Sequence, residues 1–347
     1  MFVKKILSTE KEMQAVSALL SVENLQSIEQ PDHCIGVFAQ CQLVAVGHLK
    51  NNVLMGICIH PQYRGNNLTA TLVTELLKEA NSRGITKTYL FTKTHLAEQF
   101  TSLGYELIAA REGGAALLEF GWPDYATWAS RTKSQLNGGC TFTKNTGAIV
   151  LNANPFTKGH LYLIENAAAL CDQLLVFVVE ADSSIVPFST RFKLVKEGTV
   201  HLPNCQVLAG GPYMVSQASF PAYFTGALEH ARTHAELDAT IFSTRIAPDF
   251  GITSRFVGTE PICPVTSSYN SALKKILPKN RIDVVEFDRI SDGTENRPIS
   301  ASKLRSLLAD GNLEAACLIA ADTTADWIRS SDSEAVIEKL KSYNARH

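Results

Sequence analysis

The sequence lacks an excess of charge of either sign. Its 347 residues carry 32 lysine and arginine side chains against 34 aspartate and glutamate side chains, which leaves a formal net charge of -2. Proteins that bind nucleic acid present a basic face to the phosphate backbone, and no basic tail is found here. The charge balance therefore excludes nucleic acid as an expected partner.

The sequence also lacks a long hydrophobic run. A membrane-spanning helix needs roughly 18 or more apolar residues in succession, and the best stretch, residues 167–179, is interrupted by Asp172 and Gln173. The N-terminal segment, residues 1–10, is cationic and then polar, without the apolar part of a signal peptide. These absences predict a soluble cytoplasmic protein with no membrane partner.

Cysteine is present but forms no recognisable motif. The eight cysteines are scattered and include no C-x-x-C pair, so we expect reduced, buried thiols. No internal repeat or low-complexity tract appears. With 45% hydrophobic and 19% charged residues over 347 positions, the chain is long enough for two ordinary domains.

The most informative stretch is Asn152-Ala-Asn-Pro-Phe-Thr-Lys-Gly-His-Leu161. It follows an apolar run at residues 148–151 and leads into a helix-like segment, so a strand, a tight turn and a helix start meet at Thr157-x-Gly-His160. The start of a helix has unpaired N–H groups and the positive end of the dipole, and glycine lets the backbone approach a phosphate. This stretch predicts an anion site.

A second helix start with hydroxyls and cations lies far downstream, at Ile299-Ser-Ala-Ser-Lys-Leu-Arg305. Ser300 is suited to the N-cap, while Ser302 and Arg305 are three residues apart and share a face. Simple capping is the alternative reading of Ser300. Two helix starts that face phosphates predict a site for a nucleoside triphosphate.

Together the two stretches resemble the (H/T)xGH nucleotidyltransferase superfamily, whose second signature reads I-S-x-S/T-x-x-R. The resemblance implies that His160 contacts the triphosphate and stabilises charge at the α-phosphate, that the Thr157 hydroxyl bonds a phosphate oxygen, and that Arg305 holds an outer phosphate. It implies ATP as substrate and Mg²⁺ as cofactor, with no metal ligand assigned. The other residues expected to bind ATP are Asn154, Phe156, Lys158, Gly159, Arg191, Gly258, Thr259, Glu260, Ser300 and Ser302.

Several of these assignments have plain alternatives. Lys158 occupies the variable position of the motif, so its cation could equally be solvated. The Gly258-Thr-Glu260 turn resembles the family's G-x-E turn near ribose and adenine, but it could be an ordinary strand end. Arg191 follows the opening of a predicted helix, where relatives carry a basic residue.

The second domain is predicted to span residues 147–347, after a polar approach at 131–146. Alternating strands and helices favour a doubly wound, mostly parallel Rossmann-like sheet, with ligands at the carboxyl ends of its strands. We expect strands at residues 148–152, 174–180, 206–208, 240–243, 255–257 and 282–287, and helices at 161–171, 190–200, 267–277 and 301–309.

The first domain, residues 1–130, resembles the GNAT-type acetyltransferases, so the whole chain is α/β. A strand at 53–59 runs into His60-Pro-Gln-Tyr-Arg-Gly-Asn-Asn-Leu68 and a helix to about residue 80, in the order of the GNAT pyrophosphate-binding loop. The GNAT motif ends in a small residue where Asn67 stands, which puts acyltransferase activity in doubt. Retained binding of a coenzyme-A-like group and a scaffold role both stay open. Two short strands around a turn at 40–42, a strand at 88–92 and a helix at 96–103 complete the expected elements.

Two weaker constellations concern metals. His230 and His234 have helical spacing that could hold zinc, but Ala231 stands where the metalloprotease pattern has glutamate, so a solvated helix face is the favoured reading. The acidic segment 283–292 could approach Mg²⁺, or it could be a surface strand.

The pairing of a GNAT-like half with an N-P-F-T-x-G-H half resembles the citrate (pro-3S)-lyase ligase family over nearly the whole chain. The resemblance implies an AMP-forming enzyme that uses ATP and acetate to make acetyl-AMP and pyrophosphate. It then implies acetyl transfer to the thiol of the phosphoribosyl-dephospho-coenzyme-A group on the citrate lyase acyl carrier subunit.

Two other functions remain open. An adenylyltransferase that makes a cofactor from phosphopantetheine or a mononucleotide would not need the first domain. A non-enzymatic regulator would not need both signatures.

Overall fold

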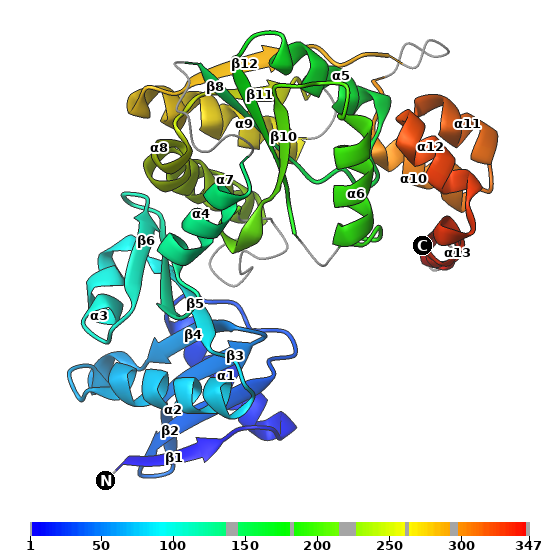
Figure 1. Ribbon diagram of the computed structural model, residues 1–347. Helices are drawn as coiled ribbons and strands as arrows, with labels where there is room; N and C mark the ends of the chain where they lie inside the picture. Colours follow the sequence, from blue (N-terminus) through cyan, green and yellow to red (C-terminus); the bar gives the residue numbers. More distant parts are fainter. Residues whose placement is uncertain are drawn as a thin grey trace. The chain divides into compact units, whose positions relative to one another are not determined.

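The computed structural model describes residues 2–136, 145–180, 184–214, 227–260, 264–291 and 298–344. Contacts divide the chain into two units, one of residues 1–128 and 220–241 and the other of residues 129–219 and 242–347. Figure 1 shows the elements of each. Within the described ranges, no helix is long and apolar enough to cross a membrane.

The first unit is built on a seven-stranded sheet in the order β1-β2-β3-β4-β5-β7-β6. Its strands are β1 Phe2–Ile6, β2 His33–Ala39, β3 Gln42–Lys50, β4 Val53–Ile59, β5 Lys87–Lys93, β6 Glu106–Ala110 and β7 Ala115–Gly121. Its helices are α1 Glu10–Val22, α2 Leu68–Ser82, α3 Ala97–Thr101 and α7 Ala227–Ile241, with α4 Tyr125–Ser134 crossing the boundary between the units. α2 forms because its apolar residues recur at helical spacing, and it buries that face on the sheet.

Among the described strands of this sheet, β4 and β5 are the one parallel pair, and they separate soon after they meet. Only Val53 with Tyr89 and Leu54 with Leu90 are in register. Beyond Leu54 the two strands diverge, and Gly56 adopts a positive φ of 57°. The divergence opens the sheet, and the cleft described below lies there.

The second unit is built on a parallel sheet in the order β10-β9-β8-β11-β12. Its strands are β8 Thr146–Leu151, β9 Gln173–Val178, β10 Cys205–Ala209, β11 Ile252–Gly258 and β12 Asp283–Phe287. β8 and β9 are almost continuously apolar, as expected for strands covered on both faces. Its helices are α5 Lys158–Ala168, α6 Phe188–Gly198, α8 Ala247–Phe250, α9 Pro264–Ile276, α10 Ala301–Ala309, α11 Leu313–Ile319, α12 Asp322–Arg329 and α13 Glu334–Asn344.

The strand order reverses between β8 and β11. The chain first moves outward from β8 through β9 to β10, then returns to the other side of β8 with β11 and β12. In open α/β sheets a crevice forms at such a switch point, outside the carboxyl ends of the strands. The residues after β8 and β11 are therefore placed to bind a ligand. The parallel strand order itself confirms the predicted doubly wound class.

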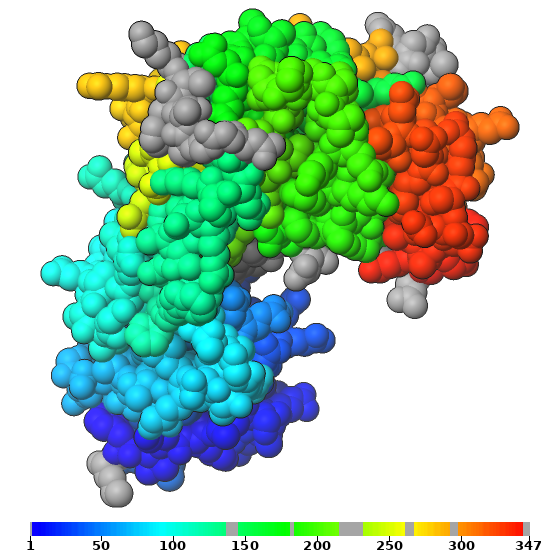
Figure 2. All heavy atoms as spheres, in the orientation of Figure 1, coloured from blue at the N-terminus to red at the C-terminus, as the bar shows by residue number. Residues whose placement is uncertain are grey.

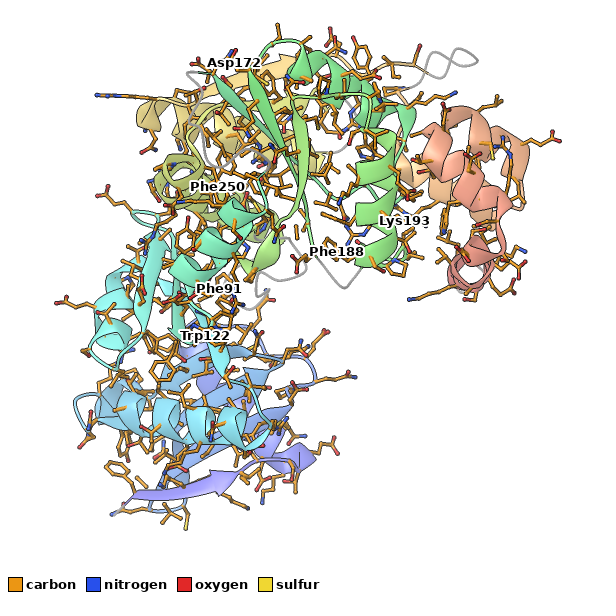
Figure 3. All side chains as sticks on the ribbon, in the orientation of Figure 1. Phe91, Trp122, Asp172, Phe188, Lys193 and Phe250 are labelled. Carbon is orange, nitrogen blue, oxygen red and sulfur yellow. The ribbon has the colours of Figure 1, made fainter. Side chains whose placement is uncertain are left out.

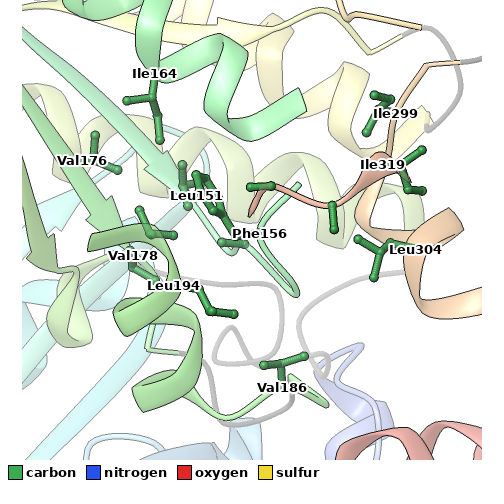
Figure 4. Close-up of a cluster of buried hydrophobic side chains, with 14 of the residues drawn as sticks. Leu151, Phe156, Ile164, Val176, Val178, Val186, Leu194, Ile299, Leu304 and Ile319 are labelled. Carbon is green, nitrogen blue, oxygen red and sulfur yellow. The ribbon is translucent and has the colours of Figure 1, made fainter. Parts of the chain in front are cut away.

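One apolar cluster of described residues supports this edge of the sheet. Figure 4 shows Leu151 and Phe156, from β8 and the loop after it, beside Ile299 and Leu304 of the α10 segment. Helices α10 to α13 gather on one side of the second unit, orange to red in Figure 2. Residues 152–161 and 299–305, the two stretches predicted to bind phosphate, thus pack on the same hydrophobic core.

Two expectations about elements are wrong. Residues 240–243 are not a strand: Thr240 and Ile241 end α7, and Phe242 begins a π-helical turn of Phe242–Ile246. A short buried apolar run fits a strand or a helix equally well, and here helix contacts decide. His234, expected on a solvated face of the same helix, is only 3% exposed.

Candidate functional site

The first half of the site is the start of α5. Thr157 is the N-cap, and its hydroxyl accepts a hydrogen bond from the backbone N–H of His160 at 3.3 Å. The His160 ring completes the cap, because its Nδ1 accepts the backbone N–H of Thr157 at 3.1 Å. The motif is thus also a capping box, in which histidine takes the position that glutamate or glutamine usually holds.

The His160 ring is neutral in this environment. Burial and then the charge of Arg289 lower its pKa from 6.5 to about 4. Because an N–H group can only donate, Nδ1 is an acceptor and the neutral ring carries its proton on Nε2. The ring stacks on Phe156, with centroids 6.1 Å apart. No described residue accepts a bond from Nε2, so His160 offers one neutral N–H donor to a ligand.

Gly159, between Thr157 and His160, is a glycine for a steric reason. A Cβ atom at this position would lie 3.3 Å from the backbone oxygen of Ile299. That is tighter than most real contacts, so a larger residue would push the start of α5 away from the segment before α10. Glycine lets the two helix starts approach each other.

The loop between β8 and α5 is held by its own polar groups. Ala153 adopts a positive φ of 47°, and the peptide bond between Asn154 and Pro155 is cis. The Asn154 Oδ1 accepts the backbone N–H of Val186 at 3.1 Å, and Phe156 is fully buried. The structure therefore gives Asn154 and Phe156, both predicted to bind ATP, clear roles in shaping the loop.

Arg191 lies in α6, three residues after Phe188, which Figure 3 labels. Its side chain is fully buried, and Nε donates to the carbonyl of Val186 at 3.0 Å. Nη1 donates to the carbonyls of Asn152 and Val179, each at 2.7 Å. One guanidinium thus ties the ends of β8 and β9 to the start of α6. This geometry favours a role in holding the loop over the predicted contact with ATP.

The second half of the site is the start of α10. Ser300 is the N-cap and accepts the backbone N–H of Lys303 at 3.2 Å. Arg305 donates from Nη1 to the carbonyl of Asn154 at 2.6 Å and from Nη2 to the hydroxyl of Ser302 at 3.3 Å. The guanidinium therefore joins α10 to the loop after β8.

Arg305 has no counter-ion among the residues that the structure describes. Burial lowers its pKa from the usual value, and no carboxylate in the described part of the chain pairs with it. A partly buried guanidinium that bonds only to neutral oxygens favours binding of an anion nearby. Ser302, its neighbour on the helix face, is available to bind the same anion.

The third part of the candidate site is the turn after β11. The backbone oxygen of Gly258 accepts a bond from Asn270 Nδ2 at 2.9 Å, and the Thr259 N–H donates to the Phe287 carbonyl at 2.8 Å. Glu260 forms an ion pair with Arg289, which follows β12. The turn is therefore fixed from both α9 and the end of β12.

These elements enclose a cavity of about 110 Å³ at the switch point. It brings together five residues predicted from sequence: Thr157, Gly159, His160, Gly258 and Ser300. The lining also includes Ile299 and Ala301 of the second stretch and Asp288 of the acidic segment, together with residues that the sequence analysis did not single out: Tyr162, Leu163, Phe287 and Arg289. The signal that could have found Phe287 and Arg289 is their place at the carboxyl end of the strand next to β11.

Lys158 faces away from this cavity. Its side chain is exposed and lines a separate depression with residues of α11 and α12, among them Glu314 and Asp326. The position of Lys158 therefore fits the alternative reading, a solvated cation, better than it fits contact with ATP. Asp283 is exposed and Glu286 pairs with Lys274, so Asp288 is the one described carboxylate of the acidic segment that reaches the cavity, and Asp292 lies outside the described residues. Among the described residues, no group of three or more histidine, cysteine, aspartate or glutamate side chains is placed to hold a metal.

The first unit has a larger cleft of its own, of about 760 Å³, where β4 and β5 diverge. One end is the start of α2, which lines the cleft with Asn67 to Ala70. Asn67 adopts a positive φ of 58° and makes no side-chain cap bond, so the first N–H groups of α2 are not capped by it. A positive φ suits glycine best and asparagine next, which explains how Asn67 occupies the glycine position of the motif.

Comparison with known proteins agrees with both halves of this picture. Residues 146–328 match the family model of the citrate lyase ligase C-terminal domain, and residues 12–105 match that of the acetyltransferase (GNAT) family. The citrate (pro-3S)-lyase ligase of Escherichia coli strain K12 is 34% identical over 93% of this chain and 92% of its own. The chain belongs to the citrate lyase ligase family. The Klebsiella pneumoniae member is 35% identical over 95% of this chain and 96% of its own.

Members of the citrate lyase ligase family are ligases, so this protein is an enzyme. Its first unit is a GNAT domain, as predicted. Among solved structures, the ribosomal-protein-S18-alanine N-acetyltransferase of Escherichia coli is 15% identical, with a TM-score of 0.29, over 35% of this chain and 94% of its own.

Proposed function

We propose that this ligase activates citrate lyase by ATP-dependent acetylation. ATP and acetate react to form acetyl-AMP and pyrophosphate, and the acetyl group then passes to the thiol of the phosphoribosyl-dephospho-coenzyme-A group on the acyl carrier subunit. The observation that carries the proposal is the cavity shared by the starts of α5 and α10, with His160 and Ser300 in its wall. Family membership supports citrate lyase as the protein that is acetylated.

The first step needs positioning and charge stabilisation rather than a protein nucleophile. An acetate oxygen attacks the α-phosphorus in line, the bond from that phosphorus to the bridging oxygen breaks, and pyrophosphate leaves. The Nε2–H of His160 donates to a phosphate oxygen as charge builds on it. Arg305, which has no carboxylate partner among the described residues, offsets the charge of the leaving pyrophosphate.

Mg²⁺ enters with the nucleotide as MgATP. Asp288 is the one carboxylate among the residues that line the cavity in the described part of the chain. A single carboxylate suits an ion that takes most of its ligands from phosphate oxygens and water. The proposal therefore needs no protein cage for the metal.

In the second step the carrier thiolate attacks the carbonyl carbon of acetyl-AMP, and AMP leaves. We propose that the cleft of the first unit holds the arm that bears this thiol. Its volume of about 760 Å³ and the uncapped start of α2 support binding of an extended group with a pyrophosphate. A scaffold role is the competing proposal. Because the reaction consumes ATP, we place it in the cytoplasm.

The decisive experiment is isotope exchange between pyrophosphate and ATP in the intact protein, with and without acetate. Exchange that depends on acetate and needs no phosphate acceptor supports the proposal. Exchange that needs phosphopantetheine or a mononucleotide instead of acetate would reassign the protein as a cofactor-forming adenylyltransferase. A His160→Asn protein serves as the control, since it should fold yet exchange poorly.

A further inference from the structure

Gly258, at the end of β11, is a glycine that the fold itself does not require. It lines the cavity, and its φ lies outside the left-handed region that favours glycine. A Cβ atom here would lie no closer than 3.9 Å to any atom outside its two neighbours in the chain. The nearest atoms belong to Arg289, which lines the same cavity. A glycine without either reason, in a cavity wall, favours a ligand that lies against the backbone.

The backbone of Gly258 is held by a side chain that is not among the residues lining the cavity. Asn270, in α9, is only 6% exposed. Its Nδ2 donates to the carbonyl of Gly258 at 2.9 Å and to Oε1 of Glu286, in β12, at 3.2 Å. A side-chain amide has two N–H donors, so each acceptor can take one of them. One buried amide therefore links α9 to the ends of β11 and β12 and has its orientation fixed.

Glu286 is itself held from α9. Lys274 lies four residues after Asn270, on the same face of the helix, and donates to Oε2 of Glu286 at 2.6 Å. The Lys274 side chain is exposed, so this ion pair contributes little to stability. Its geometry matters more, because each carboxylate oxygen has its own partner and Oε1 is kept in place for Asn270.

The residue after Gly258 has independent support. The Thr259 N–H donates to the Phe287 carbonyl at 2.8 Å, and the Thr259 carbonyl accepts the Nε–H of Arg289 at 2.7 Å. Loss of the Asn270 amide should therefore release the Gly258 carbonyl while Thr259 stays in place. The expected result is a local shift of the cavity wall rather than unfolding.

We propose that Asn270 is a positioning residue for ATP, which fixes the Gly258 backbone at the cavity wall and is oriented by Glu286. The inference rests on the proposed use of ATP at this cavity. It makes two specific statements. Asn270 strengthens ATP binding through the Gly258 backbone, and Glu286 affects ATP binding only through Asn270.

The first test compares intact wild type, Asn270→Ala and Gly258→Ala. Binding of MgATP is measured by calorimetry without acetate, and the KM for ATP is measured by pyrophosphate exchange. Asn270→Ala should weaken MgATP binding about 10-fold and raise the KM for ATP more than it lowers kcat, because the released carbonyl shifts the wall. Gly258→Ala should also weaken binding, with an unchanged melting temperature, since its methyl group enters space that the chain leaves open.

Asn204→Ala is the matched control. The Nδ2 of Asn204, just before β10, donates to the carbonyls of Ala168 and Cys171, each at 2.9 Å. This variant therefore loses as many amide hydrogen bonds as Asn270→Ala, but in a part of the unit that does not line the cavity. It should lower the melting temperature to a similar extent and leave MgATP affinity within about twofold of wild type.

A double-mutant cycle tests the role of Glu286. Glu286→Ala should weaken MgATP binding about threefold, because Asn270 keeps its bond to Gly258 but loses the acceptor that orients it. The same change in the Asn270→Ala protein should have no further effect. Glu286 is only partly buried, so the single variant tests the inference even where Asn270→Ala folds poorly.

Four outcomes would overturn the inference. They are wild-type MgATP affinity in Asn270→Ala or, where that protein folds poorly, in Glu286→Ala; an equal loss of affinity in Asn204→Ala; a further loss when Glu286→Ala is added to Asn270→Ala; and a loss confined to kcat. Failure of wild type to bind MgATP at all is a different result, because it would overturn the proposed function along with this inference.

Discussion

At the scale of single residues, the two nitrogens of His160 have separate tasks. Nδ1 closes the cap of α5, and Nε2 is left to donate to a ligand. The T-x-G-H pattern could be predicted to bind phosphate from its sequence alone, because a helix start and a glycine suffice for that conclusion. The protonation state of the ring could not, because it depends on burial and on Arg289, which lies 129 positions later in the sequence.

The division of tasks predicts that His160→Ala and His160→Asn will differ in stability but not in activity. Both lose the Nε2–H donor, so both should lower the rate of acetate-dependent pyrophosphate exchange by about 10²-fold or more. Asparagine can still accept the Thr157 N–H, so only the alanine protein should lose about 1 kcal/mol of unfolding free energy. Denaturant titration and exchange assays on the same preparations measure the two effects. Near-normal exchange in either variant would remove His160 from the catalytic group.

Stability should fall in mild acid through two histidines whose pKa values are lowered in the folded protein. Burial lowers the pKa of His48, in β3, to about 4, and burial with Arg289 does the same for His160. An unfolded histidine titrates near 6.5, so between that pH and about 4 the unfolded chain binds more protons than the folded chain. The histidine contribution is thus complete above about pH 6.5 and is lost as the pH falls toward 4.

Urea unfolding at several pH values above about 5, where carboxylates such as Glu12 still contribute fully, measures this slope. His160→Asn should flatten the slope for the second unit only. A midpoint that does not change between about pH 7 and 5 would contradict the lowered pKa values.

At the scale of elements, the starts of α5 and α10 act as one unit. Periodicity and capping residues predicted both helices. Their meeting could not be predicted from those patterns, since it depends on the Arg305 bond to the Asn154 carbonyl and on the close approach permitted by Gly159. The prediction of a strand at residues 240–243 was wrong for a different reason. There the local sequence pattern fitted a strand and a helix equally well, and packing of the helix decided between them.

Arg305→Lys should weaken MgATP binding almost as much as Arg305→Ala. A lysine is a point charge and cannot bond the Asn154 carbonyl and the Ser302 hydroxyl together, so the loop after β8 loses its link to α10. Calorimetry with MgATP compares the three proteins. Wild-type affinity in the lysine variant would show that charge alone matters at this position.

At the scale of the whole molecule, the two units interleave in sequence. α7 packs on β6 and β7 of the first unit although it lies between strands of the second. Domain limits of 1–130 and 147–347 remain a prediction, and a truncated chain that starts near residue 141 would leave α7 without that partner. Division of labour between the units is therefore better tested in the intact chain.

Filling the cleft of the first unit should separate the two half-reactions. Ala70 lines the cleft from α2, whereas Thr74 on the same helix is exposed and does not. Ala70→Trp should leave pyrophosphate exchange unchanged and slow acetylation of the carrier thiol about 10-fold or more. Thr74→Trp, the control, should leave both rates unchanged. Equal carrier acetylation in all three proteins would favour a scaffold role for this unit.

The bond between Arg305 and the Asn154 carbonyl joins positions 151 residues apart. A ribosome delivers the chain in order, so the loop after β8 emerges long before the helix that completes it. A nascent or prematurely terminated chain that stops before α10 contains every strand of the parallel sheet, yet its candidate site has one wall missing. On the proposed function, only the finished protein would therefore consume ATP, and truncated translation products would not drain the energy supply of the cell.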